Sequence, residues 1–202
     1  MAKRSGVLEF AVLGLLQDNP MHGYELRKRL NGVLGTFRAI SYGSLYPCLK
    51  DLLARGYIEE DRPLTASDTA PALSGRRAKV VYRLTADGKE RLADLLDDSG
   101  PQAWEDDAFG VRLAFFGSTD ADVRMRILQG RRSRLEERLA SLRGSMSRSR
   151  ERVDNYTVQL QQHGLASVEN EVRWLRELIE NEESNGASRA TNHPDPGHTA
   201  HR

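Results

Sequence analysis

The chain of 202 residues contains one cysteine, few aromatic residues and no long apolar run. A single cysteine cannot form an internal disulfide, so the sequence gives no reason to expect an oxidising compartment. Cys48 lies within an apolar helical pattern, where a packed structural cysteine is the common case and a redox switch the rarer alternative. No stretch reaches the roughly 18 apolar residues that a membrane span needs, so no membrane partner is expected.

The N-terminus resembles a signal peptide only superficially. The stretch MAKRSGVLEFAVLGLL has a basic start and an apolar run, but Glu9 interrupts the run and no small-residue cleavage site follows. The segment is therefore interpreted as the first helix rather than a targeting signal, and a cytoplasmic location is expected.

Catalytic and metal-binding motifs are missing as well. The sequence has no Gly-rich phosphate loop, no HExxH, no GxSxG and no nucleophile–base pattern. The acidic clusters at 97–98 and 105–107 are more typical of solvated charge near helix ends. The tail histidines do not have the spacing of a zinc finger: His193, His198 and His201. We therefore expect no enzyme, no metal and no cofactor.

The charge is uneven along the chain, although the net charge is only +1. Residues 1–91 hold 15 Lys and Arg against 10 Asp and Glu, and the remainder holds 15 against 19. A positive first half is what nucleic-acid binding requires, although chance unevenness explains a difference of this size equally well.

The most informative segment is 41–58, SYGSLYPCLKDLLARGYI. Its apolar positions recur at helical spacing and predict a buried stripe: Leu45, Leu49, Leu52 and Leu53. Ser41 suits the N-cap and Gly56 suits the C′ position. The opposite side near the positive helix end carries groups suited to phosphate oxygens and base edges: Tyr42, Ser44, Tyr46 and Lys50.

The flanking segments predict a winged helix. Two short helices are expected before this one, at 9–16 and 22–30, which is the spacing of a helix-turn-helix. After it, YIEEDR and KVVYRL are typical of strands and are separated by a polar loop at 63–77. The loop ends in RRAK, so the predicted wing is basic where a wing meets a phosphate backbone.

These segments resemble the PadR family of transcriptional regulators. The matching stretches are HGYEL at 22–26, GSLYPCLKDL at 43–52, GYI at 56–58 and YRLTADGKERL at 82–92. The second half resembles the larger PadR subgroup through RLAFFGSTDAD at 112–122 and VRWLRELI at 172–179. The resemblance implies a dimeric DNA-binding repressor that is often relieved by a small ligand.

The second half is expected to be helical. Thr85 is expected to cap a helix, and further helices are predicted at 105–116, 121–142, 148–163 and 167–182. The last helix has an apolar stripe that needs a cover: Val168, Val172, Leu175 and Ile179, with Trp174 and Leu178 beside it. The family resemblance favours a partner chain as the cover, and a monomeric helical subdomain is the alternative.

The predicted fold class is mainly α with a small β-wing. An N-terminal winged helix-turn-helix at 1–95 would bind DNA and a helical domain at 102–182 would mediate dimerisation and effector binding. The tail at 183–202 is expected to be disordered. The expected partners are double-stranded DNA, a second copy of the chain and a small-molecule effector.

Three sets of residues are predicted to carry this function. The DNA-binding set is Tyr24, Arg38, Ser41, Tyr42, Gly43, Ser44, Tyr46, Pro47, Lys50, Arg76, Arg77 and Lys79. The dimerisation set is Leu8, Phe10, Val168, Val172, Trp174, Leu175, Leu178 and Ile179. The effector set is Trp104, Phe109, Phe115 and Phe116, for which a core role is the alternative, preferred for the last two.

The predicted function is a homodimeric repressor of a pseudo-palindromic operator, modulated by a ligand. The alternative is a winged-helix protein-interaction module with a helical assembly arm, because fold alone does not fix function. The basic residues of the predicted wing favour DNA over a protein partner.

Overall fold

The computed structural model describes residues 2–34, 42–61, 80–148 and 154–191. The chain divides into two compact units. The first unit comprises Met1–Asp98 and Glu105–Thr119, and the second comprises Ser99–Trp104 and Asp120–Arg202. Among the described residues, no helix combines the length and the apolar character required to cross a membrane.

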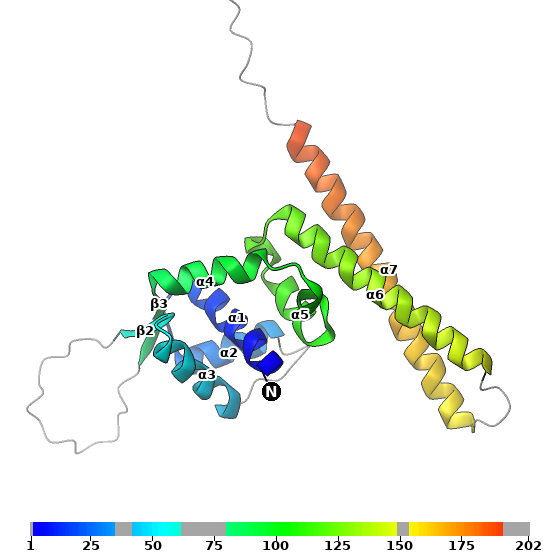
Figure 1. Ribbon diagram of the computed structural model, residues 1–202, viewed down its shortest axis with the longest axis horizontal. Coiled ribbons are helices and arrows are strands. Elements are labelled where there is room, and N and C mark those ends of the chain that lie inside the picture. Colours follow the sequence, from blue (N-terminus) through cyan, green and yellow to red (C-terminus); the bar gives the residue numbers. More distant parts are fainter. Residues whose placement is uncertain (1, 35–41, 62–79, 149–153, 192–202) are drawn as a thin grey trace, which may run out of the picture. The chain divides into compact units, whose positions relative to one another are not determined.

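The first unit is a winged helix extended by further helices after its sheet (Figure 1). Its helices are α1 (Ala2–Asp18), α2 (Gly23–Leu34), α3 (Tyr42–Ala54), α4 (Ala86–Asp97) and α5 (Asp106–Ala114), followed by the short 3₁₀ helix η2 (Phe116–Ser118). Its strands are β1 (Met21–His22), β2 (Ile58–Asp61) and β3 (Val81–Leu84). The predicted fold class, mainly helical with a small β-wing, is confirmed.

The three strands form an antiparallel sheet in the order β1-β3-β2. Ile58 is opposite Leu84 and Asp61 is opposite Val81 on one side of β3, while Met21 is opposite Tyr82 on the other. The sequence pattern predicted β2 and β3 but not β1. The two-residue strand was missed because only its pairing with a segment about 60 residues later defines it.

α1 is the central helix of this unit, with α2, α3, α4 and α5 all packed against it. Four consecutive apolar residues in its middle, Phe10 to Leu13, are buried. The helix is therefore covered on several sides. The predicted stripe of α3 completes the core, because Leu45, Leu49 and Leu52 are fully buried there.

The end of α3 follows the sequence expectation. Gly56 has a φ of +73°, and its N–H donates to the Leu53 carbonyl at 3.0 Å. The Tyr57 N–H donates to the Leu52 carbonyl at 3.0 Å, which completes a Schellman motif. The chain therefore leaves α3 at a fixed angle and enters β2 directly.

The start of α4 is held against that turn. Thr85 is the N-cap, because its Oγ1 accepts from the Gly88 N–H at 3.0 Å and donates to the Gly56 carbonyl at 2.6 Å. A Cβ added at Gly88 would overlap the backbone carbonyl of Tyr57. The absence of a side chain therefore allows α4 to approach the end of α3.

The second unit is a helical hairpin, α6 (Ala121–Arg148) and α7 (Asn155–Thr191), preceded by the 3₁₀ helix η1 (Pro101–Trp104). α6 and α7 lie side by side (Figure 1). The buried seam is Val123, Ile127, Leu128, Leu135 and Leu139 from α6 and Val168, Val172, Leu175 and Ile179 from α7.

Arg–Glu pairs flank this seam and join the two helices of the hairpin. Arg131 and Glu171 approach to 2.6 Å, and Arg124 and Glu182 to 2.8 Å. Two more exposed pairs do the same at 2.7 Å: Arg143 with Glu169 and Arg176 with Glu136. Charge complementarity therefore fixes the register of the two helices along the hairpin.

The helix boundaries predicted for the second half need correction. The segments 148–163 and 167–182 are not two helices with a break between them, because α7 is continuous from Asn155 to Thr191. Gly164 is tolerated inside it, and the helix extends past residue 182 into the segment expected to be disordered. Residues 192–202 lie outside the described part of the chain.

Candidate nucleic-acid interface

The exposed side of α3 carries most of the described members of the predicted DNA-binding set. Gly43, Ser44, Pro47 and Lys50 are exposed, and Tyr46 retains 45% of its accessible surface. Their spacing of three and four residues places them on one side of the helix, opposite the stripe buried in the core. α3 thus presents a continuous polar and aromatic surface on a rigidly packed helix.

Two tyrosines extend this surface towards α2. Tyr24, in the first turn of α2, is 66% exposed. The Tyr46 hydroxyl lies close to Gly23, where an added Cβ would be 3.3 Å from it. The start of α2 and the exposed side of α3 therefore adjoin, and Tyr24 borders the same surface.

Pro47 lies inside α3 rather than at its start. A proline has no N–H, so the carbonyl of Gly43 does not receive the usual intrahelical hydrogen bond from position 47. Both residues are exposed. Pro47 therefore interrupts the intrahelical hydrogen-bond pattern on the exposed side of α3.

The described part of the wing is acidic. Three exposed residues of β2 carry carboxylates, Glu59, Glu60 and Asp61, and Arg83 of β3 pairs with Glu59 at 2.9 Å. Five members of the predicted DNA-binding set lie outside the described residues: Arg38, Ser41, Arg76, Arg77 and Lys79. Tyr42 begins α3, but its side chain is also outside the described part.

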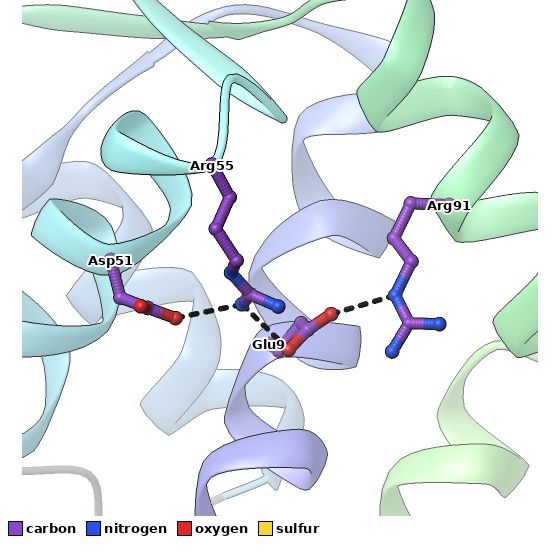
Figure 2. A network of polar contacts seen from close by, with 4 residues as sticks. All are labelled: Glu9, Asp51, Arg55 and Arg91. Atoms are coloured by element: carbon purple, nitrogen blue, oxygen red, sulfur yellow. Dashed lines mark hydrogen bonds and ion pairs between the residues drawn. The ribbon is translucent and has the colours of Figure 1, made fainter.

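A buried charge network behind α3 was missed from the sequence (Figure 2). Glu9 of α1 is only 5% exposed, and its carboxylate accepts from Arg55 at 2.8 Å and from Arg91 of α4 at 2.9 Å. Arg55 also pairs with Asp51 at 2.8 Å. The only signal in the sequence was one carboxylate inside an apolar run.

Burial and charge act on Glu9 in opposite directions. Burial raises the pKa of its carboxyl group, but the hydrogen bonds and charges of Arg55 and Arg91 outweigh this and bring the pKa below its usual value. Glu9 is therefore ionised at neutral pH, and the network is an ion pair rather than a neutral hydrogen bond.

Cys48 lies on the inner side of α3, where it is 9% exposed. Burial, together with the nearby Glu9 and Asp51 carboxylates, raises the pKa of its thiol to about 12. With this pKa the thiol is protonated at neutral pH, so little of the reactive thiolate is present. Cys48 is therefore a packing residue.

The predicted effector residues are divided between the two units. Phe115 packs edge-on against Phe10, with ring centroids 5.2 Å apart, and Phe109 is buried in the same unit. Phe116 in that unit is half-buried. These contacts agree with the core interpretation for Phe115.

Trp104 belongs to the second unit and packs on α6. A Cβ added at Gly130 would overlap its indole ring, and the Arg134 guanidinium lies 6.0 Å from the ring centroid. Arg131 donates to the Trp104 backbone carbonyl at 3.2 Å. Trp104 therefore anchors η1 to α6.

Arg112 is a second buried charge that sequence reasoning missed. It is 8% exposed, donates to the Leu95 carbonyl and to Asp98 at 3.1 Å, and lies 4.7 Å above the Phe10 ring. The contacts join α5 to the end of α4 and to α1. The segment 105–119 is consequently part of the winged-helix unit.

Most of the predicted dimerisation residues are covered within one chain. Phe10 lies in the core of the first unit and Leu8 packs against it. α6 covers Val168, Val172, Leu175 and Ile179, so these four residues offer no free stripe to a partner chain. Trp174 is 41% exposed and Leu178 is half-buried.

A winged helix with an exposed, polar third helix is an arrangement that many DNA-binding proteins share. The sequence model of the transcriptional regulator PadR-like family matches residues 12–94. The matched residues extend from α1 to α4 of the winged-helix unit. Residues 107–182 match a second family model, the C-terminal region of virulence activator alpha.

The negative transcriptional regulator PadR of Bacillus subtilis is 26% identical over 140 residues, which is 69% of this chain and 72% of that protein. Its crystal structure in complex with operator DNA aligns at 24% identity and a TM-score of 0.40, covering 87% of this chain and 99% of that chain. The same protein in complex with p-coumaric acid aligns at 23% identity and a TM-score of 0.39, covering 88% and 99%. With TM-scores this low, the fold assignment depends on the elements described above.

Proposed function

We propose that the protein is a homodimeric cytoplasmic repressor that binds a pseudo-palindromic operator through α3. The observation that carries the proposal is the exposed side of α3, where Ser44, Tyr46 and Lys50 stand on a helix with a fully packed inner side. Hydroxyl groups in the first turns of a helix and a lysine further along the same side suit phosphates and base edges. The similarity to a B. subtilis negative regulator crystallised with operator DNA supports this assignment.

A binding-site selection with the purified protein and random duplex DNA tests the proposal. We expect a two-fold symmetric motif whose half-sites are about one helical turn apart. Lys50→Ala should weaken binding to every sequence and lower the salt slope by about 1, whereas Ser44→Ala should relax preference at individual positions. Lys89→Ala is the matched control, because it removes the same charge from an exposed position on α4. Equal losses for Lys50→Ala and Lys89→Ala would contradict the assignment to α3.

The proposed dimer surface is an exposed apolar side of α7. Tyr156, Leu160 and Trp174 are 85%, 70% and 41% exposed. Together with Leu178 they fall within roughly 40° around the helix, at about 110° from the stripe that α6 covers. Exposed aromatic and aliphatic side chains aligned in this way are typical of an interface, and a second copy of the chain is the proposed occupant.

Sedimentation measurements test this surface. Leu160→Glu is expected to convert the dimer to a monomer, because it places a charge inside an apolar interface. Gln162→Glu adds the same charge at an exposed position on another side of α7 and should leave the dimer intact. A dimer that survives Leu160→Glu would exclude this side of the helix.

We also propose that an aromatic small molecule lowers operator affinity. The support is the similarity to a regulator crystallised with p-coumaric acid and the presence of a half-buried Trp104 in the second unit. The measurement is operator binding with increasing p-coumaric acid, followed by other aromatic acids. In a Trp174→Phe variant the fluorescence of Trp104 alone reports the ligand, since the chain has two tryptophans. No change in affinity or fluorescence across such acids would contradict the proposal.

The acidic strand β2 favours the second candidate, a winged-helix module that binds a basic protein segment. Glu59, Glu60 and Asp61 are all exposed, with Glu59 and Asp61 on one face of the strand and Glu60 on the other, and such carboxylates would repel a phosphate backbone at close range. Absence of an enriched DNA motif at moderate salt would favour this alternative. Neither candidate requires a catalytic step, a metal or a cofactor.

A further inference from the structure

The Glu9 network joins three helices at the end of α3 (Figure 2). Glu9 is on α1, Arg91 is on α4, and Arg55 directly follows α3. Both guanidinium groups donate to the same carboxylate, one to each oxygen. The end of α3 is therefore connected through one buried acid to both neighbouring helices.

A buried carboxylate is an unusual choice if packing alone is required. Apolar side chains of similar volume commonly stabilise such positions as well as an ion pair does, because burial of charge is costly. Apolar contacts such as those of Leu49 and Leu52 are non-directional, so they define the orientation of a helix less sharply than hydrogen bonds do. Hydrogen bonds to two fixed oxygens select one of these arrangements.

The network adjoins the proposed DNA-binding surface through the helix itself. Asp51 directly follows Lys50, and Arg55 lies just beyond the last turn of α3. The Schellman motif at Gly56 makes this end rigid. A small rotation of α3 at Arg55 would therefore displace Ser44 and Tyr46 relative to base edges, where hydrogen bonds tolerate little error.

We propose that Glu9 is a positioning residue for operator recognition, which sets the orientation of α3 by holding Arg55 and Arg91. This inference rests on the proposed DNA-binding function. It assigns to Glu9 no contact with DNA, so its substitution should change discrimination between sequences more than overall attraction to DNA.

Two substitutions separate positioning from stability. Glu9→Gln keeps the shape and removes the charge, while Glu9→Met supplies an apolar side chain of similar length. Both leave Arg55 paired with Asp51, and the Arg55 and Arg91 side chains are 36% and 34% exposed, so water can solvate them. Asp51→Asn is the matched control, because it removes a carboxylate from the exposed edge of the same network and keeps the Glu9 bridges.

The measurement is the ratio of affinities for the selected operator and a scrambled duplex, at a temperature where circular dichroism shows each variant folded. We expect Glu9→Gln and Glu9→Met to lower the ratio by about tenfold, similar to the loss of one matched base pair. Affinity for the scrambled duplex should stay within about twofold, and Asp51→Asn should keep the ratio within about twofold.

An unchanged ratio in folded Glu9→Gln or Glu9→Met protein would overturn the proposal. If both variants fail to fold, Arg91→Gln provides the test, because a half-exposed arginine is readily replaced; it should also lower the ratio, and an unchanged ratio would count against the inference. Lack of any operator preference in the wild-type protein would instead contradict the proposed function itself.

Discussion

The two units are stabilised in different ways. The winged-helix unit surrounds α1 with four helices and a sheet, and its few buried charges are held in two specific networks. The hairpin unit has one narrow apolar seam between two helices, flanked by Arg–Glu pairs and bordered by an exposed apolar side of α7. A unit with a closed core fixes its helices in place, whereas a two-helix unit leaves apolar surface exposed.

Leu→Ala substitutions in the two cores should give the largest difference in stability between the two units. Leu52 and Leu175 are both fully buried, so each Leu→Ala change should destabilise its own unit by about 2–5 kcal/mol, with Leu52→Ala nearer the upper end because its surroundings cannot collapse. Both tryptophans, Trp104 and Trp174, belong to the second unit. Tryptophan fluorescence in urea therefore reports the hairpin, while circular dichroism reports both units.

Independent unfolding of the two units would be contradicted if Leu52→Ala shifts the fluorescence transition as far as the circular dichroism transition. That result would mean that the units unfold as one cooperative body. Val33→Ala, at a 42% exposed position on α2, is the control and should change stability by less than about 0.5 kcal/mol.

Two Gly→Ala substitutions, one in each unit, should give the next largest difference in stability. One should destabilise its unit and the other should stabilise it. Gly88→Ala should destabilise the first unit by about 1–3 kcal/mol, because the new methyl group would overlap the Tyr57 carbonyl. Gly164→Ala in α7 meets open space and should stabilise that helix by up to about 1 kcal/mol. Thermal unfolding measures both, and a stabilising Gly88→Ala would show that α4 can move away from the α3 turn.

Acid should affect the first unit through Glu9. The folded-state pKa of Glu9 is below its unfolded value, so its contribution is fully present above the unfolded pKa and is lost as the pH falls through the folded one. Hydrogen bonds of this charged type contribute roughly 1.5–3 kcal/mol. Urea unfolding followed by circular dichroism between neutral and acidic pH should show this loss in the wild type and a weaker one in Glu9→Gln. Identical pH profiles would be inconsistent with an ionised Glu9.

The smallest effect is expected at the rim of the hairpin. Arg143 and Glu169 have side chains that are 59% and 37% exposed, so Arg143→Gln should cost less than about 0.5 kcal/mol and the loss should vanish in high salt. Arg131→Gln should cost more, because its side chain is only 7% exposed and also holds the Trp104 carbonyl. If both substitutions shift the fluorescence transition equally, the exposed and the buried Arg–Glu pairs do not differ in their contribution to stability.

Local patterns in the sequence predicted much of the fold. The stripe of α3, the glycine after its last turn and the Thr85 cap each depend on residues within a few positions, so spacing alone reveals them. The continuity of α7 through Gly164 was not predicted, because packing on α6 compensates for one poor helix former.

The missed site residues share one cause. Glu9 is 46 positions from Arg55 and 82 from Arg91, and no local pattern marks such pairs. Arg112 pairs with Asp98, which is 14 positions earlier, and lies over the ring of Phe10, which is far more distant in the sequence. The stripe of α7 was assigned to a partner chain for a related reason, since a stripe shows that a cover exists without showing which helix provides it.

The chain crosses between its two units three times, because Ser99–Trp104 belongs to the hairpin while Glu105–Thr119 belongs to the winged helix. The boundary of the matched C-terminal family model, at residue 107, therefore falls inside the winged-helix unit. A single genetic crossover cannot exchange either unit alone, since any cut leaves a segment of at least one unit joined to the other. The two units are consequently expected to be inherited together, so variants of this architecture should arise by substitution within a whole chain rather than by exchange of its parts.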